Sequence, residues 1–189
     1  MSFLKKYGVV ILGVMIGIVW VAIESGVFST NDNSRPDPII FASYERGYEV
    51  TAPGNWTRMP EEEADGINLI LEAPRGVASF MIFEELKSDY NITSDEYYNA
   101  LVSMTAYELN ELPDDEVQLE DTEAFTINGS EAKGCEFYYT DAGGLNLRFM
   151  LHFFETDDAY VRVVSSAKVS EFETYKPIFK EMAESIVVK

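Results

Sequence analysis

The chemistry open to this chain is limited by its single histidine, His152, and its single cysteine, Cys135. A Ser-His-Asp or Cys-His catalytic site would have to use His152, with Cys135 as the only thiol partner. His152 lies in LNLRFMLHFFE, on the same strand parity as Met150 and Phe154, and no G-x-S-x-G motif accompanies it. We therefore interpret His152 as a core histidine and Cys135, within GCEFYYT, as a small buried apolar residue.

Metal and cofactor chemistry finds little support in the sequence. One histidine and one cysteine cannot supply the usual ligands of zinc. There is no phosphate-binding G-x-x-x-x-G-K-[ST] or G-x-G-x-x-G motif, so we expect no cofactor. Acidic clusters could bind a divalent cation weakly, but no D-x-[DN]-x-[DN]-G loop arranges their oxygen atoms, and we interpret them as solvated surface. The clusters are Glu61, Glu62, Glu63 and Asp65; Asp114, Asp115 and Glu116; Glu120, Asp121 and Glu123; and Asp157 and Asp158.

The chain is strongly acidic, because 33 Asp and Glu residues stand against 14 Lys and Arg residues, a formal net charge of −19. This charge repels phosphate backbones, so we expect no nucleic-acid partner. It is compatible with a basic protein partner, with cation accumulation, or simply with solubility. A single cysteine allows no intrachain disulfide, so the domain must rely on its core.

The N-terminal segment predicts a membrane anchor. Lys5 and Lys6 precede an apolar run at residues 7–23, YGVVILGVMIGIVWVAI, which as a helix would cover about 25 Å of a bilayer core of about 30 Å. The lysines place residues 1–6 in the cytoplasm and everything after Glu24 outside. A cleaved signal peptide is the alternative, but AIESG offers no good pair of small residues before a cleavage site. We therefore expect a single-pass protein of the cytoplasmic membrane, with a polar tether at residues 24–38 and one domain at 39–189.

Strand and helix signals fill that domain. Apolar strands are predicted at 67–72, 78–84, 145–155 and 159–167, and the Asn128-Gly129 pair predicts a two-residue hairpin turn. Capping boxes at 93–96 and 170–173 predict two helices, the second containing Pro177 as a kink or a fresh start. The strand at 145–155 is apolar on both faces and needs cover on both sides. The expected fold class is therefore α+β, an α/β/α sandwich with a central antiparallel sheet, preceded by one transmembrane helix.

Several segments resemble the PsbP-like family. Tyr48, Pro53 and Trp56 in YEVTAPGNW resemble the opening of that family's domain, and similar segments are TSDEYYNAL, TINGSEAKGCEFYYT and the C-terminal AYVRVVSSAKVSEFETYKPIFKEMAESIVV. The resemblance covers residues 40–188. It implies an α/β/α sandwich in a family that includes the PsbP subunit of photosystem II, bacterial envelope proteins and a Ran-binding import factor. Its members bind and support other proteins, so it implies no catalytic residues. A photosystem role is not implied, because this chain has an anchor and a tether that the plant photosystem subunit lacks.

Three Asn-x-Ser/Thr sequons begin at Asn55, Asn91 and Asn128, on the face expected to be exported. In most bacteria they would be accidental, whereas archaeal envelopes use such sequons. Asn91, in a loop, is the best candidate for glycosylation, and Asn128, in a tight turn, is the poorest.

These observations favour a membrane-anchored, non-enzymatic module that binds a protein partner as an accessory or assembly factor. An envelope hydrolase acting through paired carboxylates is one alternative. A small accessory subunit whose transmembrane helix makes the contacts is the other, and Gly13 and Gly17 give it weak support.

The anchor interpretation makes a direct prediction. Membranes bearing the full chain should keep it through alkaline carbonate extraction, whereas a chain lacking residues 1–23 should appear in the supernatant, because it has lost its apolar span. Immunoblots of the two fractions measure this. A mature polypeptide found free in the medium and beginning near residue 27 would instead show a cleaved signal peptide.

Overall fold

The structure is a computed structural model, and it describes residues 36–44, 47–64, 66–110, 120–121, 125–140 and 146–189. The predicted cytoplasmic start, the anchor at 7–23 and nearly all of the tether lie outside this part of the chain. Within it, no helix has both the length and the apolar character needed to cross a bilayer.

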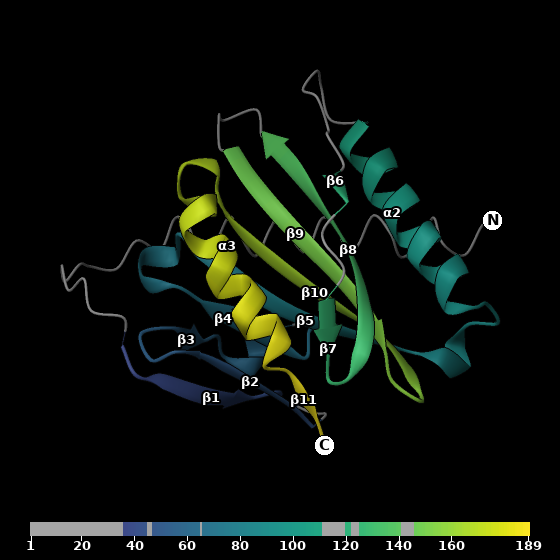
Figure 1. Ribbon diagram of the computed structural model, residues 1–189, viewed down its shortest axis with the longest axis horizontal. Coiled ribbons are helices and arrows are strands. Elements are labelled where there is room, and N and C mark those ends of the chain that lie inside the picture. Colours follow the sequence, from purple (N-terminus) through teal and green to yellow (C-terminus); the bar gives the residue numbers. More distant parts are fainter. Residues whose placement is uncertain (1–35, 45–46, 65, 111–119, 122–124, 141–145) are drawn as a thin grey trace.

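Eight strands of the described residues form one antiparallel main sheet, in the order β3-β4-β5-β10-β9-β8-β6 with β7 also paired to β8 (Figure 1). In β9 and β10, His152 lies opposite Val163, and in β8 and β9, Cys135 lies opposite Leu151. This confirms the central antiparallel sheet. The strands are β3 (Thr57–Arg58), β4 (Leu69–Glu72), β5 (Ala78–Leu86), β6 (Glu120–Asp121), β7 (Phe125–Ile127), β8 (Ser130–Thr140), β9 (Asn146–Glu155) and β10 (Ala159–Lys168).

A separate small sheet joins the two ends of the domain. Its order is β1 (Pro38–Ala42), β2 (Tyr48–Pro53) and β11 (Val187–Val188). Nothing in the sequence indicated that the last residues of the chain would pair with the β1–β2 hairpin. The backbone N–H of Lys189 donates to the carbonyl of Gly47 at 2.7 Å and extends this pairing to the C-terminus.

Two helices and three short 3-10 turns complete the described part of the fold: α2 (Ser94–Asn110), α3 (Val169–Glu184), η1 (Glu61–Glu63), η2 (Pro74–Gly76) and η3 (Lys87–Asp89). The capping box before α2 is confirmed, since the N–H of Thr93 donates to Glu96 Oε2 at 2.8 Å and the N–H of Glu96 donates to Thr93 Oγ1 at 3.3 Å. The capping box before α3 is wrong. That helix begins at Val169 with no side-chain cap and continues through Pro177 without a fresh start.

The hairpin turn is confirmed as well. Asn128 and Gly129 have φ angles of 49° and 79°, the left-handed conformations that a two-residue type I′ turn requires. The turn reverses β7 into β8.

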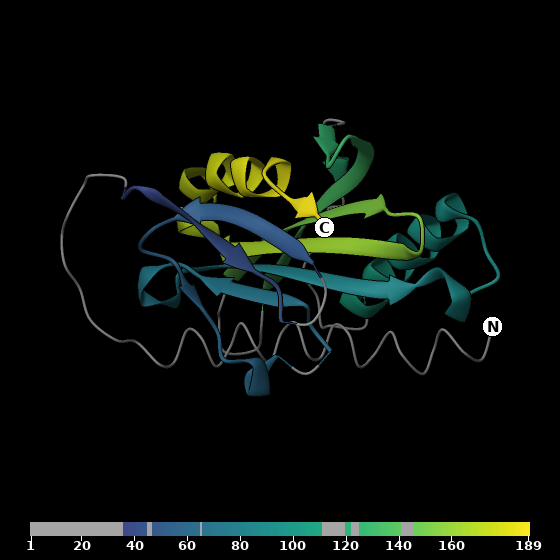
Figure 2. The same cartoon turned by 90° about the horizontal axis from the view of Figure 1, so that it is seen from below.

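One face of the main sheet packs against α3 and the small sheet (Figure 2). The buried side of α3 consists of Phe172, Phe179, Met182 and Ala183. Trp56 joins them from the turn after β2, with its ring 6.3 Å from that of Phe179 in an edge-on arrangement. Trp56 thus fixes the β1–β2 hairpin to the core. The sheet residues in this core are Leu69, Leu71, Phe80, Ile82, Met150, Phe154, Val161 and Val163.

The opposite face of the main sheet forms a second core, against which Leu101 and Val102 of α2 pack. Phe137 and Phe149 stack there with ring centroids 4.9 Å apart. The helix begins on a group of aromatic rings in which Tyr97 stacks on Tyr160 at 4.3 Å. The two helices therefore cover opposite faces of the sheet, as a strand that is apolar on both sides demands. The sheet residues in the second core are Ile70, Met81, Phe83, Cys135, Phe137, Leu147, Phe149, Leu151 and Val164.

A buried ionic network ties α3 to the sheet. Glu136, only 4% exposed, accepts hydrogen bonds from Arg148 Nη2 at 2.5 Å and lies 2.7 Å from Lys176 Nζ. Arg148 also donates to Glu173 at 2.7 Å and stacks over the ring of Phe172. Each buried charge thus has an opposite charge beside it, which a buried carboxylate requires.

The start of β1 is held close to the turn after β2, and this predicts a sensitive glycine. A Cβ atom at Gly54 would lie 2.4 Å from the backbone carbonyl oxygen of Asp37, so Gly54→Ala should push the start of β1 away from β2. We expect the amides of Ile39 and Phe41 to exchange with deuterium at least tenfold faster, corresponding to roughly 1.4 kcal/mol or more of local opening free energy. Hydrogen exchange read by mass spectrometry measures this, and unchanged exchange in β1 would contradict the packing described.

Candidate functional site

The two residues that could have built a nucleophilic site lie on opposite faces of the main sheet. Cys135 belongs to the core beneath α2, 2% exposed. His152 shares its face with Met150 and Phe154, beneath α3, and is also 2% exposed. Since strand side chains alternate between faces, this pair cannot meet. The structure therefore confirms both as core residues.

His152 is held in its neutral form. Burial, and to a smaller extent the positive charge of Lys180, lowers the pKa of His152 to about 3. A proton acceptor with so low a pKa has little use as a general base near neutral pH.

The acidic clusters are only partly within the described residues, which contain no group of three or more His, Cys, Asp or Glu side chains placed to hold a metal ion. Asp157 and Asp158 are exposed in the turn between β9 and β10, and Glu61 and Glu62 are exposed on η1. Asp65, Asp114, Asp115, Glu116 and Glu123 lie outside the described residues.

The three sequons differ in their surroundings. Asn55 and Asn91 are exposed, Asn91 in the loop that leads into α2. Asn128 is exposed too, but it occupies the tight turn, and its Oδ1 accepts a hydrogen bond from the N–H of Val188 at 3.4 Å.

A cluster of tyrosines at the start of α2 is structural. Arg162, 4% exposed in its side chain, donates to Glu85 at 2.6 Å, and Tyr90 donates to the same carboxylate. Burial, followed by this contact with Glu85, raises the pKa of Tyr90, and burial raises that of Tyr97. The rings pack on one another and fasten the helix to the sheet.

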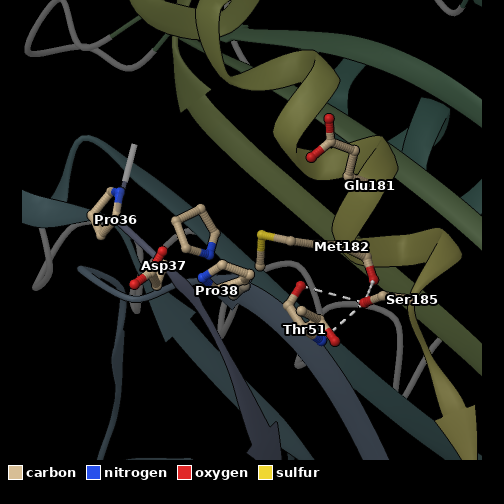
Figure 3. Close-up of a pocket in the computed structure, with 9 residues that line it drawn as sticks. Pro36, Asp37, Pro38, Thr51, Glu181, Met182 and Ser185 are labelled. Carbon is tan, nitrogen blue, oxygen red and sulfur yellow. Dashed lines mark hydrogen bonds between the residues drawn. The ribbon is translucent and has the colours of Figure 1, made fainter. Parts of the chain in front are cut away.

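The feature that sequence reasoning missed is an open pocket of about 400 Å³ where β1, β2 and the end of α3 meet (Figure 3). Three prolines and Met182 supply its apolar wall. Asp37 stands on the strand side and Glu181 on the helix side, so the pocket is bordered by two carboxylates. The lining residues are Pro36, Asp37, Pro38, Thr51, Ala52, Pro53, Glu181, Met182 and Ser185.

The Ser185 hydroxyl group in this pocket is already used by the fold. Ser185 Oγ accepts from the N–H of Thr51 at 2.9 Å and lies 2.7 Å from the carbonyl of Met182 and 3.3 Å from that of Thr51. The side chain of Ser185 thus extends the pairing of β11 with β2 and links the end of α3 to the small sheet. A serine whose hydroxyl group is held in this way is a structural link between the helix and the sheet.

Next to the pocket lies the outer surface of the small sheet, which we define as Ile40, Ala42, Glu49, Thr51 and Val187. These residues share one face, because Ile40 lies opposite Thr51, and Glu49 lies opposite both Ala42 and Val187. Ile40 is 66% exposed and Val187 is 47% exposed. Exposed apolar side chains beside carboxylates are suited to contact with another macromolecule.

No signal in the sequence could have predicted this surface. Its residues come from both ends of the domain, and the pairing that joins them spans most of its length. The alternation of Ile39 and Ile40 is also ambiguous, since either residue could have faced the core.

Three solved structures show what this architecture is similar to, whereas no protein-family model and no curated protein matches the sequence. Cyanobacterial PsbP (CyanoP) from Synechocystis sp. PCC 6803 superimposes with a TM-score of 0.59 and 16% identity, covering 86% of this chain and 99% of that one. PA94 from Pseudomonas aeruginosa, a putative regulator of unknown function, gives 0.51 and 16%, covering 80% and 97%. LpqN from Mycobacterium tuberculosis, involved in cell envelope biogenesis, gives 0.51 and 13%, covering 85% and 88%.

At such identities the likeness establishes the fold. The domain is a mixed α+β structure of the PsbP-like kind, as the segments around Tyr48, Trp56 and the C-terminal helix implied.

The buried neutral His152 predicts a specific loss of stability in mild acid. The unfolded chain takes up a proton near pH 6.5 and the folded chain only near pH 3, so the free energy of unfolding falls as the pH drops through this window. Between pH 7 and pH 5 the fall due to His152 is about 2 kcal/mol. Urea unfolding in detergent at pH 7 and pH 5 gives the free energy of unfolding of the full chain and of His152→Gln. The contribution of His152 is the difference between the two proteins in how far this free energy falls. An equal fall of the free energy of unfolding in both proteins would show that His152 is accessible to protons in the folded chain.

Proposed function

We propose that this chain is a non-catalytic accessory module that binds another protein of the cell envelope. In this proposal residues 7–23 hold the domain at the outer face of the cytoplasmic membrane, and the outer surface of the small sheet makes the contact. An accessory or assembly factor for envelope or membrane proteins fits this arrangement.

The observation that carries the proposal is the contrast between the main sheet and the small sheet. Both faces of the main sheet are consumed by core packing, including the one histidine and the one cysteine. The small sheet keeps Ile40 and Val187 exposed next to a pocket. A protein partner can bury such side chains, whereas catalysis would need convergent, unsatisfied polar groups.

The envelope location draws support from two sources. The apolar run behind Lys5 and Lys6 predicts export with retention in the membrane. LpqN, which has the same fold, is involved in cell envelope biogenesis. Anchoring would confine the domain to two dimensions and raise its effective concentration for membrane neighbours.

Glycosylation belongs to the same proposal. On an exported domain, Asn91 is the sequon most open to modification, with Asn55 next. Asn128 is the poorest acceptor, because its side chain contacts the C-terminal strand.

Two valines of similar exposure allow a matched test of the surface. Val187→Asp places a charge on the outer surface of the small sheet, and Val169→Asp does the same at the start of α3, where the wild-type residues are 47% and 42% exposed. Crosslinking in intact cells, followed by mass spectrometry, should recover a defined partner with wild type and with Val169→Asp. Recovery with Val187→Asp should drop about tenfold, because a carboxylate would be buried at the contact.

Equal recovery with both variants would remove the small sheet from the proposal. A defined partner lost only when residues 1–23 are deleted would favour a role for the membrane helix. Finding no partner with the full chain would contradict the accessory role itself.

A further inference from the structure

The pocket between β1, β2 and the end of α3 combines an apolar interior with a charged rim. Its most buried lining residues are Ala52 and Met182, each 1% exposed, and Pro53 is also buried. Asp37 and Glu181 line the same pocket but are exposed to solvent. The volume of about 400 Å³ lies within the range of roughly 300–1,000 Å³ that is typical of ligand sites.

The two carboxylates stand on opposite sides of the pocket, with Pro38 and Met182 between them (Figure 3). Among the described residues, no Lys or Arg lines the pocket. Within the part of the chain that the structure describes, no cation forms an ion pair with Asp37. Lys189, which reaches the outer surface of the small sheet, is already paired with Glu49. The rim therefore carries negative charge that the described lining residues do not balance.

This combination of charge and apolar surface selects the kind of ligand. Negative potential at the rim attracts a cation and repels phosphate groups, carboxylates and anionic lipid headgroups. A calcium ion would need about six to eight oxygen ligands, whereas the interior is lined by proline rings and a methionine. The described residues also place no three acidic, His or Cys side chains together for a metal ion. The pocket is suited to an organic cation with an apolar body.

We infer that the pocket receives an arginine side chain of the protein partner, which deepens the proposed function and rests on it. A guanidinium group presents five N–H donors in one plane, so it can donate to carboxylates on both sides of the pocket at once. It is weakly hydrated, and its aliphatic stem packs on apolar surface such as that of the proline rings. A lysine ammonium group is a strongly hydrated point charge and fits this arrangement less well.

The pocket opens beside the surface proposed for the partner. Thr51 belongs to both, because it lines the pocket and lies opposite Ile40 on the outer surface of the small sheet. A partner that buries Ile40, which is 66% exposed, would therefore also cover the rim of the pocket. Excluding water there strengthens the attraction between a guanidinium group and the two carboxylates. The net charge of −19 further favours the approach of a basic partner segment.

Binding of a defined probe tests the chemistry of the pocket. The probe is Nα-acetyl-L-arginine methylamide, added at constant ionic strength to the purified full chain in detergent with isotope-labelled methionine methyl groups. The NMR signal of the Met182 methyl group, identified by its loss in Met182→Leu, should shift and saturate at millimolar probe. The matched citrulline compound, which has nearly the same shape without the charge, should bind at least fivefold more weakly, and the matched lysine compound at least twofold more weakly.

Substitutions at the rim show which carboxylates are responsible. Asp37→Asn and Glu181→Gln remove the charges and keep the side-chain shapes, so each should weaken binding of the arginine probe about threefold, and the double variant about tenfold. Asp157→Asn in the β9–β10 turn and Glu171→Gln on α3 are matched controls at exposed positions and should leave binding unchanged. Thermal unfolding checks that every variant is folded.

The partner itself is tested with the same substitutions. Crosslinking in intact cells should recover about tenfold less of the envelope partner with the double variant, and equal amounts with the two controls. Mass spectrometry of the crosslinked peptides should place an arginine of the partner next to β1 and β2. Replacing that arginine by glutamine should lower recovery with wild type and have little further effect with the double variant, as expected for groups that bind each other.

Four results would overturn the inference: no saturating shift of the Met182 signal, equal binding of the arginine and citrulline probes, binding of the lysine probe as tight as that of the arginine probe, or unchanged recovery of the partner with the double variant. Each would leave the accessory role intact, because the comparison of Val187→Asp with Val169→Asp decides that role. Finding no partner with the full chain would contradict the accessory role, and with it the assignment of the pocket to a partner's arginine.

Discussion

Strands β9 and β10 bury side chains on both of their faces, and the rest of the domain is arranged around that requirement. Helix α3 and the small sheet cover one face, and α2 packs on the other. Apolar area removed from water on both sides supplies the main driving force, at roughly 25 cal/mol per Å². The buried charged residues Glu136 and Arg162 are paired, the first with Arg148 and Lys176 and the second with Glu85. Few polar groups of the main sheet are left for chemistry.

The small sheet follows from how the chain closes this sandwich. Trp56 fixes the β1–β2 hairpin against α3, and Ser185 joins the end of that helix to β2, so β11 can pair there. One side of the hairpin is thereby committed to the core, while its outer surface stays exposed. The outer surface of the hairpin is thus the part of the small sheet that is left to contact other molecules.

Local signals in the sequence were enough to place most elements. The Asn128-Gly129 turn, the Thr93–Glu96 capping box and the two-faced pattern of β9 act within a few residues, and the structure confirms each. The predicted capping box at Ser170 was wrong, because α3 already begins at Val169 and no side chain caps it. The small sheet and the pocket could not be predicted, since they depend on pairing between β2 and the end of the chain. The membrane anchor stays a prediction from composition.

The central claim is that the small sheet is the working surface and the main sheet is scaffold. Hydrogen exchange of the full chain in native membranes, compared with the purified chain diluted in detergent, tests it most directly. The account predicts slower exchange in membranes at the amides of Ile40 and Ala42, with β9 and β10 unchanged. Equal exchange in β1 under both conditions, or protection appearing instead along α2, would contradict it.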